Sequence, residues 1–335
     1  MQRKIATGIS IVGIVLLILD PATAMTSAKE SIALCLQSLI PTLFPFLLLS
    51  GILTAGIQGN HAPWLSALGR KSGIGQQGVS TFLLGILGGY PVGAQSISQQ
   101  YRNKSITKDT AQILLSFCNN AGPSFLFGIL GPQFSAWWMP WAIWGILILS
   151  AYLTGIILKY EDIPDSSHLN PSQNFSMPEM VSKSVKTMGT ICGWVMIFRI
   201  GIGYLLRFIP VELPQEVQVL LTGTLELANG CCQIHQIHDE SLRFLVASIM
   251  LSFGGVCVLM QTASVCGELG IRSYLRGKFL QTLIAAFLAL TILLPHLILV
   301  VLPAAIYFFL QKRKKVLANP IQMMYNTENP WKRGN

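Results

Sequence analysis

Residues 85–94 read GILGGYPVGA, and this stretch decides how the chain folds. It lies inside an apolar segment, about 78–98, that is close to the ~20 residues needed to cross a bilayer. Its middle is crowded by Gly85, Gly88, Gly89, Pro91 and Gly93. Glycine destabilises a helix interior and proline removes a backbone hydrogen bond, so the segment makes a poor spanning helix. We expect a re-entrant hairpin, which is tolerated only where protein or a watery cavity covers the opened backbone.

A second apolar segment, about 217–232, is interrupted by Glu226, Asn229 and Gly230. The other apolar runs are interpreted as full spans, the last two of which are short for a bilayer crossing. These predicted spans are 4–19, 32–57, 110–130, 138–158, 187–208, 243–266, 278–294 and 297–311. The sequence therefore predicts an all-α polytopic membrane protein in which two segments are broken.

The composition agrees with this class and excludes several functions. Of the 335 residues, 52% are hydrophobic and only 11% are charged, whereas a soluble protein has about 25% charged residues. The net charge of +9 is typical of cytoplasmic loops, and no basic cluster is interleaved with aromatic residues, so we expect no nucleic-acid partner. The chain lacks GxSxG, HExxH and Walker A motifs, so we expect neither an enzyme nor an ATP-driven pump.

Cysteine and histidine residues give little support for a cofactor. The seven cysteines are odd in number and mostly lie in apolar runs, which does not favour a disulfide framework. Cys231 and Cys232, with His235 and His238, could form a metal site, but spacing alone is weak evidence and a loop at the membrane surface is the simpler interpretation. We predict no metal and no other cofactor.

Loop charges orient the spans, because basic residues favour the cytoplasmic side. The N-terminal apolar run fits a cleaved signal, with Ala22-Thr23-Ala24 as its cleavage site, or a retained first span, which we favour. The loops predicted inside carry Arg70 and Lys71; Arg102, Lys104 and Lys108; Lys159, Lys183 and Lys186; and Arg272, Arg276 and Lys278. The loops 131–137 and 209–242 are then outside. The basic run 312–315 is inside only if the chain turns back near Pro295-His296.

The chain contains a faint internal repeat. Leu-Ser-Phe occurs at 115–117 and again at 251–253, and at the same offset Gly93-Ala94 aligns with Asn229-Gly230. Each unit has the order span, broken hairpin, span, and an odd number of crossings between equivalent elements makes the second unit inverted. Inverted repeats with broken helices at corresponding positions indicate a secondary transporter with its site near the midplane.

This repeat predicts five parts of the chain. They are an N-terminal span or signal-like segment at 1–30, a first repeat at 31–137, a linking span and cytoplasmic loop at 138–180, a second repeat at 181–270, and a C-terminal hairpin with a basic tail at 271–335.

Polar and conformationally special residues in the first unit are candidates for lining a solute site. In the first broken segment these are Gly89, Tyr90, Pro91 and Gly93, because exposed N–H groups at a half-helix start suit anionic or acceptor groups. Close helix packing by small residues is the alternative. Within the span 110–130 the candidates are Asn119, Asn120, Gly122 and Pro123, and the alternative is internal hydrogen bonding that stabilises a kink.

In the second unit, Gly254, Gly255 and Gln261 occupy the matching positions. Arg199 lies near the middle of the span 187–208, where a charge costs about 2.5–3.5 kcal/mol on insertion scales and usually faces an interior or a pathway. Arg199 and Glu226 could form a structural salt bridge. Alternatively, Arg199 binds a substrate carboxylate and Glu226 carries a coupling proton or cation.

Four motifs in this chain resemble a known family. They are PTLFPF at 41–46, GYPVGA at 89–94, SFCNNAGP at 116–123, and SFGG at 252–255 followed by Gln261. Together they are similar to the YlbJ-type sporulation integral membrane proteins, which belong with the nucleoside-recognition "Gate" domain proteins. The resemblance covers about residues 25–300. The second unit departs from the pattern, because 225–230 holds no equivalent of GYPVGA.

The resemblance implies a fold related to the repeats of concentrative nucleoside transporters, and a role like that of the protein that moves dipicolinate into the forespore. Residues 89–94, 119–123 and 254–261 would then line the solute path. We expect a secondary transporter of a small polar, anionic solute in the bacterial inner membrane, or in the forespore membrane if the sporulation role holds. The alternative is a non-transporting scaffold or sporulation assembly factor. Expected partners are the solute, the lipid bilayer, and a second copy or other sporulation membrane proteins.

Overall fold

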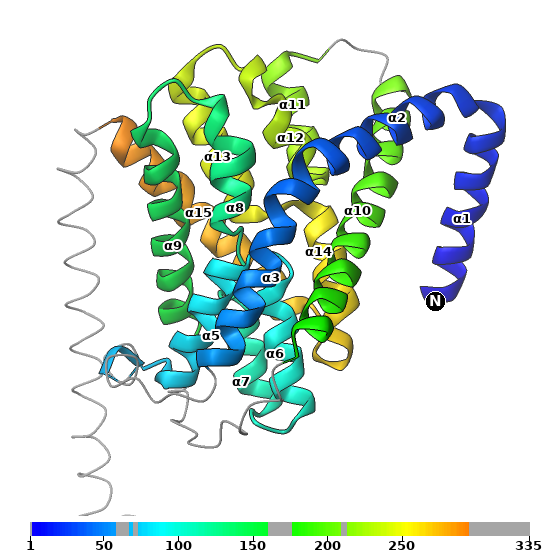
Figure 1. Cartoon of the computed structure of the whole chain (residues 1–335). Helices are drawn as coiled ribbons and strands as arrows, with labels where there is room; N and C mark the ends of the chain where they lie inside the picture. The colour runs from blue at the N-terminus through cyan, green and yellow to red at the C-terminus, as the bar shows by residue number, and fades with distance from the viewer. Residues whose placement is uncertain (1, 58–66, 70–72, 160–175, 209–212, 295–335) are drawn as a thin grey trace, which may run out of the picture. The chain divides into compact units, whose positions relative to one another are not determined.

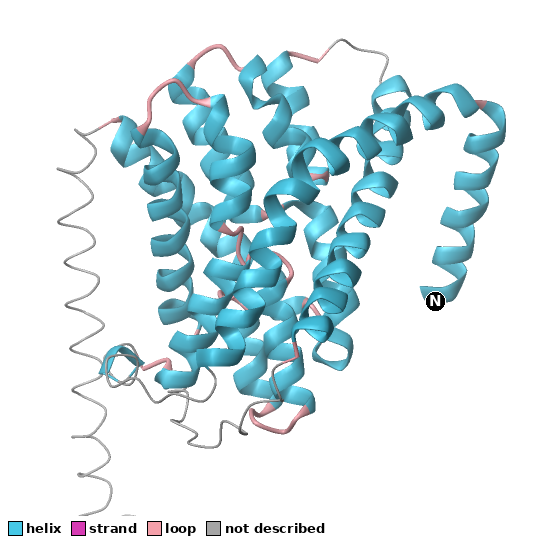
Figure 2. Ribbon diagram, viewed as in Figure 1, coloured by secondary structure: helices cyan, strands magenta, loops and turns pink. Residues whose placement is uncertain are grey.

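A computed structural model describes residues 2–57, 67–69, 73–159, 176–208 and 213–294. The regular elements in these ranges are helices, and none of the described residues forms a strand (Figure 2). The chain divides into two compact units, Met1–Ala286 and Phe287–Asn335. The functional residues discussed below all lie in the first unit, whose helices are labelled in Figure 1.

Five of the described helices are long and apolar enough to cross a bilayer: Pro21–Ile52, Trp138–Leu158, Met177–Phe208, Glu240–Leu269 and Arg272–Leu293. In the most apolar window of Glu240–Leu269, 61% of residues are buried, against 17% in that of Pro21–Ile52. Glu240–Leu269 is therefore central to the unit, whereas Pro21–Ile52 exposes most of its apolar surface, as a lipid-facing helix does.

The first helices extend the predicted spans. α1 (Gln2–Leu19) matches the prediction 4–19, and the span predicted at 32–57 begins earlier, as α2 (Pro21–Leu34), η1 (Cys35–Leu39) and α3 (Ile40–Ile57) in succession. α2 begins at residue 21 because Asp20 accepts a hydrogen bond from the Thr23 N–H and Pro21 occupies the first turn. Glu30 lies inside α2.

Three further helices support the predicted spans and correct the start of two of them. α9 (Trp138–Leu158) coincides with the prediction, and α10 (Met177–Phe208) begins ahead of the predicted 187. α15 (Arg272–Leu293) begins ahead of 278, so Lys278 is a helical residue and not part of a loop, as its charge had suggested. The second arm predicted at 297–311, and the turn at Pro295-His296, lie outside the described residues.

Both segments predicted to be broken are interrupted at the expected positions. α5 (Gly75–Gly88) and α6 (Val92–Arg102) are separated at Gly89–Pro91, where Gly89 has a φ of 72°. α11 (Gln215–Leu225) and α12 (Leu227–Gln233) are separated at Glu226, and η4 (Ile234–Gln236) follows. The positive φ at Gly89 is a conformation that other residues rarely adopt, so the glycine itself produces the first break.

Two spans predicted to be continuous are also broken. α7 (Lys108–Leu115) ends well before α8 (Pro123–Phe125), which continues as η2 (Leu126–Leu130) and η3 (Gly131–Gln133). Gly122 is extended because the ring of Pro123 disfavours a helical residue before it. α13 (Glu240–Phe253) and α14 (Gly255–Cys266), with η5 (Gly267–Leu269), are separated by the positive φ values of Gly254 and Gly255.

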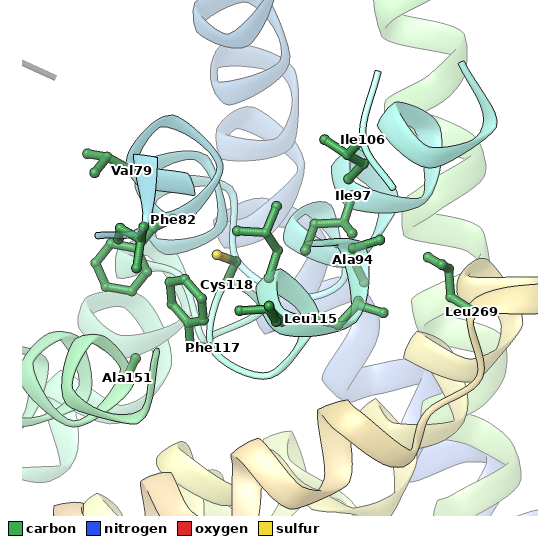
Figure 3. Packing of buried hydrophobic residues seen from close by; sticks show 14 of the residues in the cluster. Val79, Phe82, Ala94, Ile97, Ile106, Leu115, Phe117, Cys118, Ala151 and Leu269 are labelled. Atoms are coloured by element: carbon green, nitrogen blue, oxygen red, sulfur yellow. The ribbon is translucent and has the colours of Figure 1, made fainter. Parts of the chain in front are cut away.

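A hydrophobic core holds the first two broken segments against α9. Phe82 of α5 stacks on Phe117 with ring centroids 5.8 Å apart, and Ala151 of α9 lies in the same cluster (Figure 3). A Cβ atom on Gly155 of α9 would lie 2.8 Å from the Phe117 ring, so the glycine allows this close packing. The core therefore fixes the non-helical segment 116–122 from one side and leaves its other side to polar contacts.

Candidate functional site

The first two breaks touch each other through their backbones. A Cβ atom on Gly89 would lie 2.9 Å from the nitrogen of Gly122, and one on Gly122 would lie 3.0 Å from the Cα of Gly89. Gly93 packs in a similar way against the Cys118 carbonyl, which agrees with the close-packing alternative for that residue. Both breaks are thus parts of one rigid contact.

The two asparagines of the second break are fully buried and make internal hydrogen bonds. Asn119 accepts from the Ala94 N–H (3.3 Å) and donates to the Thr262 hydroxyl (3.0 Å), which joins α6 to α14. Asn120 donates to the Phe117 carbonyl at 2.7 Å. The structure places both side chains in contacts between helices, as the internal-bonding alternative describes.

Lys278 of α15 lies at the centre of this network, with 1% of its surface exposed. Its ammonium donates to Tyr90 Oη (3.0 Å), Asn120 Oδ1 (2.9 Å) and Gln281 Oε1 (2.9 Å). The Gln281 amide also donates to Asn120 Oδ1 at 2.9 Å. An ammonium has three donors, so all of them are used, and the group connects both breaks to α15.

Sequence reasoning missed Lys278 because it counted the residue as a loop charge. A signal was present: Tyr274, Lys278, Gln281 and Ala285 recur at helical spacing, and all four are buried. A polar stripe of this kind on an apolar helix indicates an interior face.

The breaks of the second half meet the first half at Tyr90. The Tyr90 hydroxyl donates to the Leu251 carbonyl of α13 at 3.2 Å, and a Cβ atom on Gly254 would lie 2.7 Å from that hydroxyl. Gly255 packs against the carbonyls of Gly223 and Thr224 next to the α11–α12 break. All four interruptions are thus linked by direct contacts.

Glu226 is buried and begins α12. Its carboxylate accepts from the N–H groups of Ala228 (3.0 Å) and Asn229 (2.7 Å), which is the geometry of a helix N-cap. The predicted coupling residue therefore has at least one structural role.

One cavity, here called the central pocket, borders three of these breaks, at Gly89, Gly122 and Glu226. It is walled by side chains of α3, α8, α10 and α14, and its cavity volume is about 50 Å³. The space free of protein atoms reaches about 570 Å³ when the solvent at its open side is included. The predicted site residues in its lining are Gly89, Tyr90, Gly122, Glu226 and Gln261. Ser124, which sequence reasoning did not select, also lines it. An apolar wall with a few polar groups is typical of sites for small organic molecules.

The remaining predicted residues lie outside the lining of the central pocket. They are Pro91, Gly93, Asn119, Asn120, Pro123, Arg199, Gly254 and Gly255. Pro91 lines a neighbouring cavity. Arg199 forms an ion pair with Glu30 of α2, with Nε 3.1 Å from Oε2, and lines neither cavity. In the described part of the chain, no three His, Cys, Asp or Glu side chains are grouped so as to hold a metal ion.

Comparison with known proteins adds one relative. No family model and no solved structure matches the chain. The chain is similar to the sporulation integral membrane protein YlbJ of Bacillus subtilis (strain 168), at 23% identity over 320 aligned positions that cover 79% of this chain and 76% of YlbJ. The chain is related to the YlbJ-type membrane proteins. The resemblance of the four motifs to YlbJ-type proteins is thus supported, and the Gate-domain part of that resemblance stays a prediction.

The YlbJ-type relationship agrees with the helices. YlbJ is described as an integral membrane protein, and five described helices of this chain are long and apolar enough to span a bilayer. The chain is therefore a multi-pass membrane protein.

Proposed function

We propose that this YlbJ-type chain is a secondary transporter of a small polar organic solute, either a dipicolinate-like anion or a nucleoside. The observation that carries the proposal is the meeting of four interrupted helices at one pocket with polar groups in its wall. Interrupted helices at membrane depth occur where protein or an aqueous cavity covers the open backbone, and transporter sites are built in this way.

We also propose that the chain consists of two inverted repeats of Gate type. The order long helix, broken pair, broken pair occurs as α2–α3, α5–α6 and α7–α8, and again as α10, α11–α12 and α13–α14, with α9 between them. In Figure 1, α5 and α6 lie toward the lower end and α11 toward the upper end, which supports re-entrant hairpins that enter from opposite sides. Alternating closure of such hairpins over the central pocket would move the solute.

The solute class comes from the family resemblance and not from YlbJ's description, which mentions only sporulation. Dipicolinate-like anions and nucleosides are the two candidates. The absence of a Walker A motif in the sequence favours secondary transport, and we propose no catalytic role.

A second candidate function is a non-transporting scaffold or sporulation assembly factor. The observation in its favour is that Asn119 and Asn120, selected from the sequence as solute ligands, make internal hydrogen bonds. In that case these residues and the pocket would matter only through stability.

The test is uptake of labelled dipicolinate and labelled uridine by proteoliposomes containing the full chain. Gln261→Leu removes a polar group from the pocket wall at similar volume, and Gln215→Leu, at an exposed position outside both cavities, is the matched control. A lost hydrogen bond to a charged solute costs about 1.5–3 kcal/mol, so we expect uptake at low solute concentration to fall about ten-fold or more in Gln261→Leu only.

Both variants must keep the unfolding temperature of the parent protein for this comparison to hold. No uptake of either solute by the parent protein, or undiminished uptake by Gln261→Leu, would favour the scaffold.

A further inference from the structure

A second cavity, here called the basic pocket, lies beside the central pocket between α6, α10 and α14. Two polar stripes face each other across it. The stripe on α6 consists of Gln95, Gln99 and Arg102, and the stripe on α10 consists of Lys183, Lys186 and Thr190. Spacings of three, four and seven residues place each set on one face of its helix. The basic pocket is therefore formed by two facing helix surfaces, and its three cations, Arg102, Lys183 and Lys186, are exposed at its opening.

The charge of the basic pocket is one-sided. Arg102, Lys183 and Lys186 line it, and its lining includes no aspartate or glutamate. None of these three cations forms an ion pair with an acid within the described ranges. Glu179 lies one turn before Lys183 on α10 but does not line the cavity. Three cations without internal counter-charges create a positive potential that attracts small anions.

The basic pocket is separated from the central pocket by very little protein. Gln261 and Ile191 line both cavities, and we call these two side chains the partition. Tyr90 lines the central pocket and the next residue, Pro91, lines the basic pocket. The two cavities therefore adjoin at the partition, and Lys183 lies about two helical turns along α10 from Ile191.

We propose that the basic pocket is a cytoplasmic binding vestibule for small organic dianions, which pass across the partition into the central pocket. This inference rests on the proposed transport function. The carboxylates would bind Arg102 by its planar fork and the two lysines as point charges. The cytoplasmic side follows from the positive-inside bias of the segments that carry these residues.

The inference is tested with Lys183→Gln/Lys186→Gln, which removes two vestibule charges, and with Lys104→Gln/Lys108→Gln, which removes two exposed lysines outside both cavities. Equilibrium binding of labelled dipicolinate is measured on the purified full chain, and uptake of dipicolinate and uridine is measured in proteoliposomes. In the vestibule variant we expect the Kd for dipicolinate and the KM for its uptake to rise on the order of ten-fold. The maximal rate of dipicolinate uptake and the uptake of uridine stay unchanged in the vestibule variant. The control variant binds and takes up dipicolinate as the parent protein does.

The two proposals fail differently. An unchanged KM for dipicolinate in the vestibule variant, or uptake of uridine but not of dipicolinate by the parent protein, overturns the vestibule and leaves transport intact. Dipicolinate binding that depends on Lys183 and Lys186 without uptake of any solute supports the vestibule as a binding site and overturns the transport function. Neither binding nor uptake overturns both.

Discussion

Lys278 is a buried cation whose contacts are with neutral groups. Its hydrogen-bond partners are Tyr90, Asn120 and Gln281, and its Nζ lies 5.1 Å from the centre of the Tyr90 ring and 5.7 Å from that of Tyr274. Cation–π contacts of this kind add stabilisation in a desolvated site. An ionisable residue inside a membrane protein is costly and marks a functional position by default.

Replacing Lys278 by methionine should lower both stability and uptake. Each oxygen left without a donor costs about 1–3 kcal/mol, so we expect the unfolding temperature in detergent to fall by several degrees. Lys108→Met, at an exposed position, is the control. A double-mutant cycle with Asn120→Leu should give a coupling energy of about 0.5–3 kcal/mol. Additive effects would contradict the assigned contact.

The two roles of Glu226, helix cap and proposed coupling group, can be tested separately. Glu226→Gln keeps one of the two carboxylate oxygens that cap α12 and removes the charge. If Glu226 carries a coupling proton, uptake driven by a pH gradient should fall at least ten-fold (about 1.4 kcal/mol), while solute exchange without a gradient persists. Glu216→Gln, exposed on α11, is the control. Parallel loss of exchange and thermal stability would leave Glu226 with the cap role only.

The ion-pair partner of Arg199 could not be predicted from the position of Arg199 in its span. A charge at mid-span is costly, so a partner for Arg199 was expected, and the structure contains one. The insertion energy does not indicate which acidic residue is that partner. The structure pairs Arg199 with Glu30, 169 residues earlier, and not with Glu226. Such a pairing depends on how α2 and α10 pack, which the spacing of charges along one chain does not encode.

At the scale of elements, backbone contacts between glycines position the breaks. Gly277 of α15 lies so close to Ser116 that a Cβ atom would overlap the Ser116 carbonyl. The non-helical segment 116–122 therefore lies between α15 and the core around Phe117.

Gly277→Ala should destabilise the protein by about 1–3 kcal/mol, because the added methyl group overpacks this contact. Gly189→Ala on α10 is the matched control: it meets no atom within 4 Å, and it should be neutral or stabilising by about 0.5–1 kcal/mol. Denaturant unfolding in detergent measures both. Equal midpoints for the two variants would refute the assigned packing.

Local sequence located some breaks and not others. The cluster of glycines at 85–93 and the charge of Glu226 predicted two of them, since each violates the requirements of a spanning helix. The runs that contain Gly122-Pro123 and Gly254-Gly255 were interpreted as full spans, and Pro123 predicted only a kink in the first of them. Whether a kink becomes a full interruption depends on partners such as Thr262 and Lys278 that replace the lost backbone bonds.

At the scale of the whole molecule, the inverted arrangement makes a topological prediction. The turn after α6 should face the cytoplasm and the loop after α12 should face outward. In a Cys232→Ser background, a membrane-impermeant maleimide should label Gln236→Cys in intact cells and Asn103→Cys only after lysis. Labelling of both positions in intact cells would contradict the inversion.

The partition of Gln261 and Ile191 also has an electrical consequence. Each elementary charge that crosses 100 mV releases about 2.3 kcal/mol, so a bacterial membrane potential acts strongly on any ion able to pass. Gln261 and Ile191, which line both cavities, must therefore block the passage of small ions as well as select the solute. Shortening the hydrophobic one, by Ile191→Ala, should turn the protein into a leak for small ions, detectable as conductance in a planar bilayer where the parent chain gives none.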